Sequence, residues 1–424
     1  MAEQMKQEAA GKTIPAGYKQ TEVGVIPEDW EVAPIGSVLS ITTGARNTQD
    51  KVDDGRYPFF VRSQTVERIN TYSFDGEAVL TAGDGVGTGK IFHYVNGKFD
   101  FHQRVYLMYN FGERVSGYFF YLYFSNNFFE RIMSMTAKSS VDSVRREMIA
   151  DMKMVLPSKV EQTAIANVLS DSDALIGALE QLIAKKQAIK SATMQQLLTS
   201  RTRLPAFALR PDGTPKGYKP SELGDIPEDW EVSCIGDNCH TYSGGTPSTS
   251  NKDYYGGSIR WITSSDLNKG QIFEVEGRIT DSGLQFSSAK EIKAGSFLIA
   301  LYGATAGVCA ISHVDAAINQ AVLAVVPREC SSKYLFYWFS MNKNKIIETY
   351  TQGGQPNLSG DIIRSVALPF PLKEEQTAIA TILSDMDNEL QALTQKLDKA
   401  RALKQGMMQQ LLTGKIRLPL TAGA

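Results

Sequence analysis

Two long stretches of the chain carry apolar residues that alternate by four and by three positions. This spacing is the heptad seam of a helix that packs lengthwise against another helix. The later seam consists of Ile379, Leu383, Met386, Leu390, Leu393, Leu397, Ala400, Lys404, Met407 and Leu411. The earlier seam begins Ile165, Leu169, Ile176, Leu179 and Ile183 and then fades, and a second stripe of Val168, Leu175, Leu182 and Ile189 widens it. No proline or run of glycines interrupts either stretch, so we predict helices over 158–200 and 371–413, each about 60 Å long.

The two predicted helices have the same length and the same spacing of apolar positions. Either helix alone would expose a long apolar stripe to water. The simplest arrangement that buries both stripes is an antiparallel coiled coil within one chain. The alternative is two independent core helices, and it leaves the matched lengths without an explanation.

The helices belong to a larger internal repeat. Residues 17–32 read GYKQTEVGVIPEDWEV, and residues 217–232 read GYKPSELGDIPEDWEV. The helices begin EQTAIANVLSDSD at Glu161 and EQTAIATILSDMD at Glu375. Trp30 and Trp230 recur with the first block, and we interpret them as core anchors rather than as surfaces that stack on bases.

The segments between the repeated blocks, 35–156 and 235–368, share little sequence. Their β-branched and aromatic runs at 103–109 and 321–326 predict strands. One helix is predicted in each segment, at 117–133 and 333–349. We therefore predict an α+β fold in which two similar globular domains are held apart by the two antiparallel coiled-coil helices, as a pseudo-two-fold internal repeat. The predicted parts are an arm (1–16), the first domain (17–157), the first helix (158–200), a linker (201–216), the second domain (217–370), the second helix (371–413) and a tail (414–424).

Charge and cysteine content narrow the class of protein. The net charge is −2 and the isoelectric point is near 6.2, which argues against a simple basic DNA-coating protein. Sequence-specific binding stays open, because local clusters matter more than the total charge. All four cysteines lie in the second half without a CxxC pair or a zinc-ligand spacing, so we expect free thiols in a reducing cytoplasm and no metal. No apolar stretch approaches the length of a membrane span, and the first residues lack a secretory signal.

Motifs for catalysis are missing. The loop GDGVGTGK at 83–90 is not a Walker A motif, because Asp84 stands at the first glycine position and Ile91 at the Ser/Thr position. No segment is typical of base flipping beside S-adenosylmethionine. Asp151-Met152-Lys153 and Glu291-Ile292-Lys293 have nuclease-like spacing but no upstream carboxylate partner. We expect no catalytic site in this chain.

The repeated blocks resemble those of the specificity subunits of type I restriction–modification systems. The resemblance rests on IPEDWEV in each half, on Leu-Pro pairs shortly before Glu161-Gln162 and Glu375-Gln376, and on the helix ends MQQLL-T. It covers nearly the whole chain beyond residue 16.

The resemblance implies that each globular domain is a target recognition domain that reads one half of a bipartite, asymmetric DNA target. It also implies that the helices set the spacer and dock two modification (methyltransferase) subunits, and that restriction (motor-nuclease) subunits join them. S-adenosylmethionine, Mg²⁺ and ATP would then be ligands of those partners and not of this chain.

Side chains with several donors and acceptors read base edges, and cations hold phosphates. On these grounds the DNA-binding candidates in the first half are Arg62, Ser63, Gln64, Thr88, Lys90, His102, Gln103, Arg104, Lys138, Ser139, Ser140, Arg145 and Arg146. In the second half they are Thr263, Ser264, Ser265, Tyr302, Thr305, Asn319, Gln320, Gln352, Gln355 and Asn357. Each is alternatively a solvated surface residue. His102-Gln103 and Asn319-Gln320 stand at matching places, which also suits a structural role that ties a loop to a strand.

For two groups of residues in and just after the helices, the sequence leaves several kinds of contact possible. The basic residues of the distal helix halves face DNA phosphates, acidic partner surfaces or solvent: Lys185, Lys186, Lys190, Arg201 and Arg203 after the first seam, and Lys396, Lys399, Arg401, Lys404, Lys415 and Arg417 after the second. Met194, Leu198, Met408 and Leu412 are candidates for contact with partner helices.

Two other classes of function remain as alternatives. A two-headed coiled-coil adaptor would bind proteins and show no sequence-dependent affinity for DNA. A self-contained nuclease or methyltransferase would be active as the purified chain, and the missing motifs argue against it.

Overall fold

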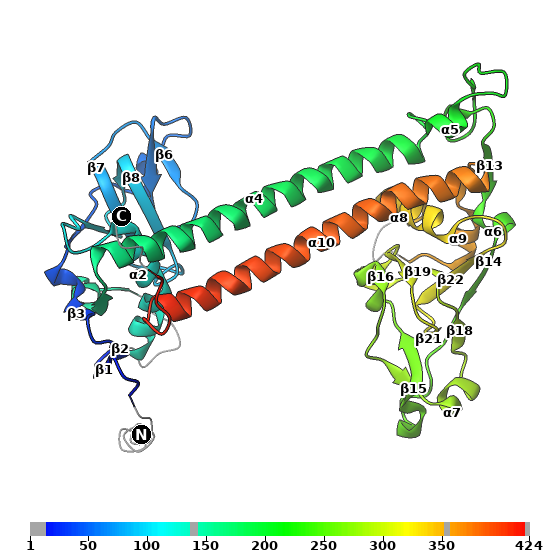
Figure 1. Ribbon diagram of the computed structural model, residues 1–424. Coiled ribbons are helices and arrows are strands. Elements are labelled where there is room, and N and C mark those ends of the chain that lie inside the picture. The colour runs from blue at the N-terminus through cyan, green and yellow to red at the C-terminus, as the bar shows by residue number, and fades with distance from the viewer. Residues whose placement is uncertain (1–13, 136–142, 352–356, 420–424) are drawn as a thin grey trace. The chain divides into compact units, whose positions relative to one another are not determined.

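The computed structural model describes residues 14–135, 143–351 and 357–419 (Figure 1). The chain forms two compact units. Unit 1 consists of Met1–Glu180 and Gln395–Ala424, and unit 2 consists of Gln181–Thr394. Each unit therefore combines one globular domain with parts of both long helices, α4 (Lys159–Leu198) and α10 (Lys373–Leu411).

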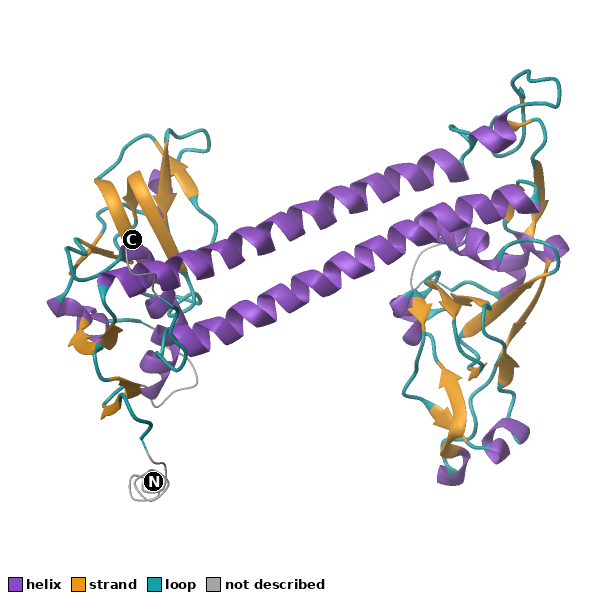
Figure 2. Cartoon of the chain, in the orientation of Figure 1, coloured by secondary structure: helices purple, strands orange, loops and turns teal. Residues whose placement is uncertain are grey.

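The domain of unit 1 is built on a six-stranded sheet with the order β4-β9-β7-β8-β5-β6, drawn in orange in Figure 2. Its strands are β4 (Ser40–Thr43), β5 (Tyr57–Phe60), β6 (Glu67–Ile69), β7 (Phe74–Ala82), β8 (Phe92–Phe101) and β9 (Val105–Tyr109). β5 runs parallel to β8, and the other pairs are antiparallel. Two small antiparallel pairs accompany the sheet: β1 (Tyr18–Thr21) with β2 (Gly24–Pro27), and β3 (Glu31–Pro34) with β10 (Lys153–Leu156).

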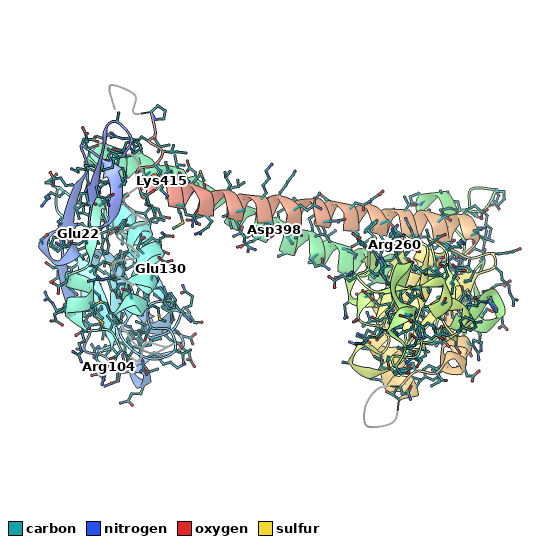
Figure 3. All side chains as sticks on the ribbon, turned by 90° about the horizontal axis from the view of Figure 1, so that it is seen from below. Glu22, Arg104, Glu130, Arg260, Asp398 and Lys415 are labelled. Carbon is teal, nitrogen blue, oxygen red and sulfur yellow. The ribbon has the colours of Figure 1, made fainter. Side chains whose placement is uncertain are left out.

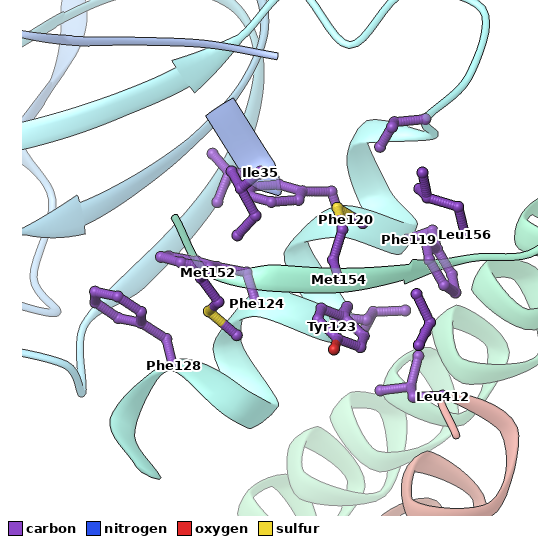
Figure 4. Close-up of a cluster of buried hydrophobic side chains, with 14 of the residues drawn as sticks. Ile35, Phe119, Phe120, Tyr123, Phe124, Phe128, Met152, Met154, Leu156 and Leu412 are labelled. Atoms are coloured by element: carbon purple, nitrogen blue, oxygen red, sulfur yellow. The ribbon is translucent and has the colours of Figure 1, made fainter. Parts of the chain in front are cut away.

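The core of unit 1 is organised by α2 (Gly117–Ser134), which is followed by the short α3 (Arg146–Ala150). Phe120, Phe124 and Phe128 recur every four positions, so they share one face of α2, and all three are fully buried. Their rings stack in series, with centroids 5.3 and 4.4 Å apart. Figure 4 shows this cluster with Met154 of β10 and with Leu412, which follows α10. Burial of each such side chain contributes about 1.5–3 kcal/mol.

Unit 2 contains a five-stranded sheet with the order β14-β22-β19-β20-β16 and a four-stranded sheet with the order β17-β15-β21-β18. The five-stranded sheet comprises β14 (Cys239–Ser243), β16 (Gln271–Ile272), β19 (Phe297–Ala300), β20 (Cys309–Ser312) and β22 (Val322–Pro327). The four-stranded sheet comprises β15 (Tyr255–Ile262), β17 (Arg278–Ile279), β18 (Lys290–Ile292) and β21 (Ala316–Ile318). Two small pairs are β11 (Tyr218–Lys219) with β12 (Ile226–Pro227), and β13 (Glu231–Cys234) with β23 (Ala367–Phe370). The helices are α5 (Pro205–Ala208), α6 (Ile235–Asn238), α7 (Asp281–Gln285), α8 (Ser332–Tyr350) and α9 (Gly360–Ser365).

The two domains share a strand order despite their different sequences. The run β4-β9-β7-β8 in unit 1 has its counterpart in β14-β22-β19-β20 of unit 2. In both domains one long helix follows, α2 or α8, and a short helix then leads into a strand that pairs with the IPEDWEV block. The predicted strands at 103–109 and 321–326 and the predicted helices at 117–133 and 333–349 are confirmed by β9, β22, α2 and α8. Mixed α+β domains are therefore present in both halves.

The long helices run antiparallel within each unit. In unit 1, Asp173 pairs with Lys404 (2.5 Å) and Glu180 with Arg401 (2.6 Å). Residue numbers therefore fall along α10 in the direction in which they rise along α4. In unit 2, Lys186 pairs with Glu389 (2.7 Å) and Lys190 with Asp387. The heptad positions lie on the packed side, whereas Leu175, Leu182 and Ile189 of the second stripe are 38–55% exposed. The second stripe therefore does not widen the buried face, because one helix can cover only one side of its neighbour.

A matched polar cluster ties each helix start to a tryptophan and an arginine. In unit 1, the indole of Trp30 donates to Glu161, and Arg417 forms a bidentate pair with Glu161 (2.9 and 2.7 Å) and a second pair with Asp29. In unit 2, the indole of Trp230 donates to Glu375. Arg203 pairs with Glu375 (2.8 and 2.8 Å) and with Asp229. We name these the first and second arginine clusters. Both indoles are at most 1% exposed, which confirms Trp30 and Trp230 as core anchors.

Six of the basic residues in and just after the helices form ion pairs inside the chain. Lys186, Lys190, Arg203, Arg401, Lys404 and Arg417 all form ion pairs with carboxylates of their own unit. The other basic residues of these runs, Lys185, Arg201, Lys396, Lys399 and Lys415, are exposed, so a contact with DNA phosphates or an acidic partner surface stays a prediction for them.

Two further features concern the class of protein. The four cysteines are free thiols, and the sulfur atoms of Cys239 and Cys330 lie 3.7 Å apart. None of the helices in the described part of the chain combines the length and hydropathy of a membrane-spanning segment.

Candidate nucleic-acid interface

Several candidate side chains of unit 1 converge where the segments after β4, β5, β7 and β8 meet. Backbone hydrogen bonds fix this convergence: Gln103 N donates to Arg46 O (2.9 Å), His102 N to Phe60 O (2.9 Å) and Gly83 N to Arg104 O (2.8 Å). We name the side chains gathered here the first loop cluster, consisting of Arg46, Arg62, Asp84, His102, Gln103 and Arg104.

A carboxylate holds two arginines at the surface of the first loop cluster. Asp84 Oδ1 lies 2.9 Å from Arg62 Nη1, and Asp84 Oδ2 lies 3.4 Å from Arg104 Nη1. The side chains of Arg62 and Arg104 are 44% and 62% exposed, whereas that of Asp84 is 20% exposed. Arg104, labelled in Figure 3, extends from the surface of unit 1. A guanidinium group has five N–H donors, so both arginines keep donors beyond those that face Asp84.

His102 has a structural role in the same cluster. It is 4% exposed, and its Nδ1 accepts a hydrogen bond from the backbone N–H of Arg104 (2.9 Å). Burial lowers the pKa of His102, and the nearby positive charge of Arg62 lowers it further. The imidazole is therefore neutral at pH 7, with Nδ1 as acceptor, and it shapes the turn that presents Gln103 and Arg104.

Asn319 repeats this role in unit 2. Its Oδ1 accepts from the backbone N–H of Ala321 (3.1 Å), two residues further on, as His102 does from Arg104. Glycines make both turns possible: a Cβ at Gly44 would collide with the carbonyl oxygen of Phe101, and one at Gly244 with that of Ile318. The matched positions of His102 and Asn319 are thus explained by a tie from loop to strand, and the exposed residues beside them, Gln103 and Gln320, are available for contacts.

The convergence in unit 2 presents neutral polar side chains. Gln320 is exposed and accepts from the hydroxyl of Thr246, while Tyr302 is 37% exposed and bridges to the backbone of Asn357. We name these side chains, together with the small buried Ala321, the second loop cluster: Thr246, Ser264, Tyr302, Asn319, Gln320 and Ala321. The neighbouring Thr263 and Ser265 hydroxyls bond to each other (2.9 Å), and Thr263 is also held by Asp266.

The other candidates have various environments. Thr88 is buried and its hydroxyl donates to Gly85 O (2.6 Å), so it stabilises the glycine turn rather than facing a ligand. Ser63 bonds to the backbone of Thr65, and Lys90 lies 5.3 Å from the ring of Phe129. Gln64, Arg145, Arg146 and Asn357 are exposed, and Ser264 and Thr305 are half-buried. Lys138, Ser139, Ser140, Gln352 and Gln355 lie outside the described residues.

The apolar candidates for partner contact pack inside the chain. Leu412 and Met408 belong to the core of unit 1, and Leu198 belongs to the core of unit 2, with exposures of 9% or less. Met194 is partly buried against that second core. Intrachain packing therefore accounts for these side chains, since buried groups leave no surface for a partner helix.

Sequence reasoning missed four members of the loop clusters: Arg46, Asp84, Thr246 and Ala321. Arg46 is held by the buried Asp100 (3.2 Å) and by Thr71 (3.1 Å). The signal that could have found Arg46 and Thr246 is their common position two residues after Gly44 and Gly244. Within 14–135, 143–351 and 357–419, no group of three or more His, Cys, Asp or Glu side chains could hold a metal ion.

Comparison with known proteins decides the family. The model of the type I restriction modification DNA specificity domain matches this chain twice, over residues 27–191 and 227–400. The chain belongs to the type I restriction–modification specificity family. It is 25% identical over 421 residues to the MjaVIII specificity subunit of Methanocaldococcus jannaschii, covering 93% of this chain and 94% of that protein. It is 31% identical over 219 residues to the EcoDI specificity subunit of Escherichia coli, covering 49% and 48% of the two chains.

The fold agrees with this membership. The crystal structure of the S subunit of a type I restriction–modification system from M. genitalium has a TM-score of 0.63 at 14% identity, covering 97% of this chain and 99% of that one. Membership in the specificity family confirms the predicted role as a non-catalytic specificity subunit with two specificity domains. It does not support the protein-binding adaptor or the self-contained enzyme.

Proposed function

We propose that this specificity subunit reads a bipartite, asymmetric DNA target, with one half-site for each domain. The observation that carries the proposal is that both domains gather polar side chains at equivalent loops, yet the side chains at equivalent positions differ: Arg62, Asp84 and Arg104 in unit 1 against Ser264, Tyr302 and Ala321 in unit 2. Different donors and acceptors select different base edges. The two half-sites therefore differ in sequence.

The spacer follows from the two long helices, which we propose to act as an antiparallel coiled coil related by a pseudo-two-fold axis. Equivalent ion pairs support this arrangement, because Asp173–Lys404 in unit 1 matches Asp387–Lys190 in unit 2. Domains that contact successive turns of one DNA groove are about 34 Å apart, or 10 base pairs. Helices of 40 and 39 residues are long enough for that separation.

The complex needs partners, because this subunit is not catalytic. We propose that it binds two modification (methyltransferase) subunits to form a DNA adenine methyltransferase and restriction (motor-nuclease) subunits to form an ATP-dependent endonuclease. S-adenosylmethionine, Mg²⁺ and ATP are then bound by the partners. The exposed stripe of Leu175, Leu182 and Ile189 on α4 offers the apolar surface that a partner helix would cover.

The test is a genome-wide map of methylated bases in cells that express this chain with its modification subunits. We expect a new split motif that disappears when this chain is omitted. If no motif appears although a stable complex forms, the proposed function is wrong. A control chain with Trp230→Ala, which removes the core anchor of unit 2, is expected to abolish the motif by unfolding one reading domain.

A further inference from the structure

The two loop clusters can be compared position by position, because equivalent backbone hydrogen bonds frame them. His102 N donates to Phe60 O (2.9 Å), and Asn319 N donates to Ile262 O (3.1 Å). Gly83 N donates to Arg104 O (2.8 Å), and Leu301 N donates to Ala321 O (2.8 Å). From these bonds the equivalent pairs are Arg62 and Ser264, Asp84 and Tyr302, His102 and Asn319, Gln103 and Gln320, and Arg104 and Ala321. The close approach of Gly44 to Phe101 O and of Gly244 to Ile318 O adds the pair of Arg46 and Thr246.

The comparison shows a concerted difference in charge. Arg62, Arg104 and the Asp84 carboxylate between them are replaced in unit 2 by Ser264, Ala321 and Tyr302. We name the group of Arg62, Asp84 and Arg104 the Asp84 fork. All three of its residues differ in unit 2, so we interpret the aspartate and the two arginines as one functional group. The second loop cluster has no charged side chain at any of its six positions.

The geometry points to guanine recognition: we propose that Arg62 and Arg104 are the residues through which unit 1 reads guanine bases in its half-site. This inference rests on the proposed function and goes further by assigning the specificity-determining residues. A guanine presents two acceptors, O6 and N7, in the major groove, and a planar guanidinium matches both with two parallel N–H donors. Each arginine uses one Nη on Asp84 and keeps its remaining donors, on side chains that are 44% and 62% exposed.

Asp84 is a positioning residue in the Asp84 fork. A free arginine on a protein surface samples many rotamers, and ordering it on binding costs free energy. The carboxylate of Asp84 joins both guanidinium groups, so the fork is ordered before DNA arrives. The backbone of Asp84 is itself fixed by a bridge to Ser143, and Val144 N donates to Gly83 O (2.7 Å).

Arg46 differs from the two proposed readers. Its Nε donates to Asp100, whose side chain is 1% exposed, and its Nη2 donates to Thr71 (3.1 Å). Asp100 also accepts from the hydroxyls of Thr71 and Ser73 (2.8 Å each). Arg46 is therefore engaged in holding the loop, and we exclude it from the guanine-reading set.

The experiment uses the whole chain assembled with its modification subunits. The methylated motif of the wild-type complex is mapped first, and binding is then measured on duplexes in which each base pair of both half-sites is changed in turn. The variants are Arg62→Gln and Arg104→Gln, which keep a long polar side chain but favour adenine over guanine. Ser264→Ala, at the position equivalent to Arg62, is the matched control in unit 2.

We expect each arginine variant to lose discrimination at a G·C pair of one half-site by about 5- to 150-fold. Discrimination in the other half-site stays unchanged, which also verifies that the variant is folded. Asp84→Asn is expected to weaken discrimination at the same pairs by less. Ser264→Ala leaves the G·C pairs of the first half-site unaffected.

The inference is overturned if the arginine variants weaken binding to all duplexes equally and reduce its salt dependence, because that is the signature of phosphate contacts. It is also overturned if the base pairs that lose discrimination are not G·C. If the wild-type complex yields no split motif, the proposed function itself is wrong. If the wild-type complex yields a split motif that the arginine variants leave unchanged, only the assigned role of the arginines is wrong.

Discussion

The indole nitrogen of Trp30 lies 3.1 Å from a carboxylate oxygen of Glu161, although 131 positions separate these residues in the chain. Glu161 is 1% exposed, and its other contacts come from Arg417. A buried carboxylate is tolerated only when hydrogen bonds and an opposite charge replace its water. The arginine clusters are therefore positions where single substitutions have large effects.

Arg203→Ala is expected to destabilise unit 2 strongly. The side chain of Arg203 is 8% exposed, and its loss leaves Glu375, at 2%, without its cation. Removing one partner of a buried pair costs about 3–5 kcal/mol. Hydrogen exchange should show lost protection in unit 2 and little change in unit 1. The control is Arg210→Ala, whose pair with Glu228 is exposed and worth about 1 kcal/mol or less; equal effects of the two variants would contradict the buried-pair account.

Acid should weaken the second arginine cluster through Asp229. Partial burial acts to raise the pKa of this carboxyl, but the hydrogen bonds from Arg203 and Lys216 outweigh it and lower the pKa to about 2. A carboxyl whose pKa is depressed by folding stabilises the protein above its unfolded pKa, and this stability is lost as the pH falls through the folded value. Stability should therefore decline between about pH 4 and pH 2. In denaturant titrations, the free energy of unfolding of Asp229→Asn should decline less steeply with falling pH across that window than that of the wild type. An equally steep decline in both proteins would argue that Asp229 is not the responsible group.

The ion pair between Lys190 and Asp387 should contribute measurably to the helix pairing in unit 2. The side chains are 15% and 31% exposed, and the hydroxyl of Tyr337 also donates to Asp387 (2.7 Å). A double-mutant cycle with Lys190→Ala and Asp387→Ala is expected to give a coupling free energy of about 0.5–3 kcal/mol. The same cycle on Glu180 and Arg401, which are 48% and 53% exposed, should give about 1 kcal/mol or less. A larger coupling free energy for Glu180 and Arg401 than for Lys190 and Asp387 would show that burial does not determine the strength of these pairs.

Gly244→Ala should damage recognition of one half-site. A Cβ there would meet the carbonyl oxygen of Ile318, so the segment that carries Thr246 must move away from Asn319 and Gln320. The methylation map is expected to lose specificity in the half-site read by unit 2 and to keep it in the other. Gly177→Ala is the control, because no atom lies within 4 Å of its added Cβ and alanine favours a helix by about 1 kcal/mol. Full specificity in Gly244→Ala would mean that this close approach does not shape the cluster.

Helix length should set the spacer of the target. Inserting one heptad into both α4 and α10 keeps the seam in register and lengthens each helix by about 10 Å. The methylated motif is expected to keep both half-sites and to gain up to about three base pairs of spacer. Methylation at the original spacing by this variant would contradict the idea that helix length determines the length of the spacer.

The sequence predicted those features that depend on local periodicity or on exact repetition. The seams of α4 and α10, the buried Trp30 and Trp230, and the helices α2 and α8 each follow from a pattern that is visible within a few turns or strands. The Asp84 fork was not predictable in this way. Arg62 lies 22 positions from Asp84. Only the pairing of β5 with β8 and of β7 with β9 brings both residues beside Arg104.

Several residues that the sequence offered for outside contacts are used inside the chain, for a common physical reason. The six ion-paired basic residues and the apolar residues Leu198 and Leu412 stood out because they exceeded the needs of a simple two-helix seam. The chain uses them in contacts with distant segments, as in the pair of Arg417 with Glu161 across 256 positions. Such long-range contacts leave no trace in local spacing, so the residues resembled a free surface.

The composition of unit 1 has a consequence for synthesis on the ribosome. Unit 2 is a continuous stretch, Gln181–Thr394, whereas unit 1 needs Gln395–Ala424 to complete it. Leu412 packs in the core of unit 1 and Arg417 neutralises Glu161, so the domain that is translated first is completed only after the residues that follow unit 2 have been made. A ribosome that stops early would release a chain whose later domain is finished and whose earlier domain is open. The stability of the first domain therefore depends on residues that are translated after the second domain.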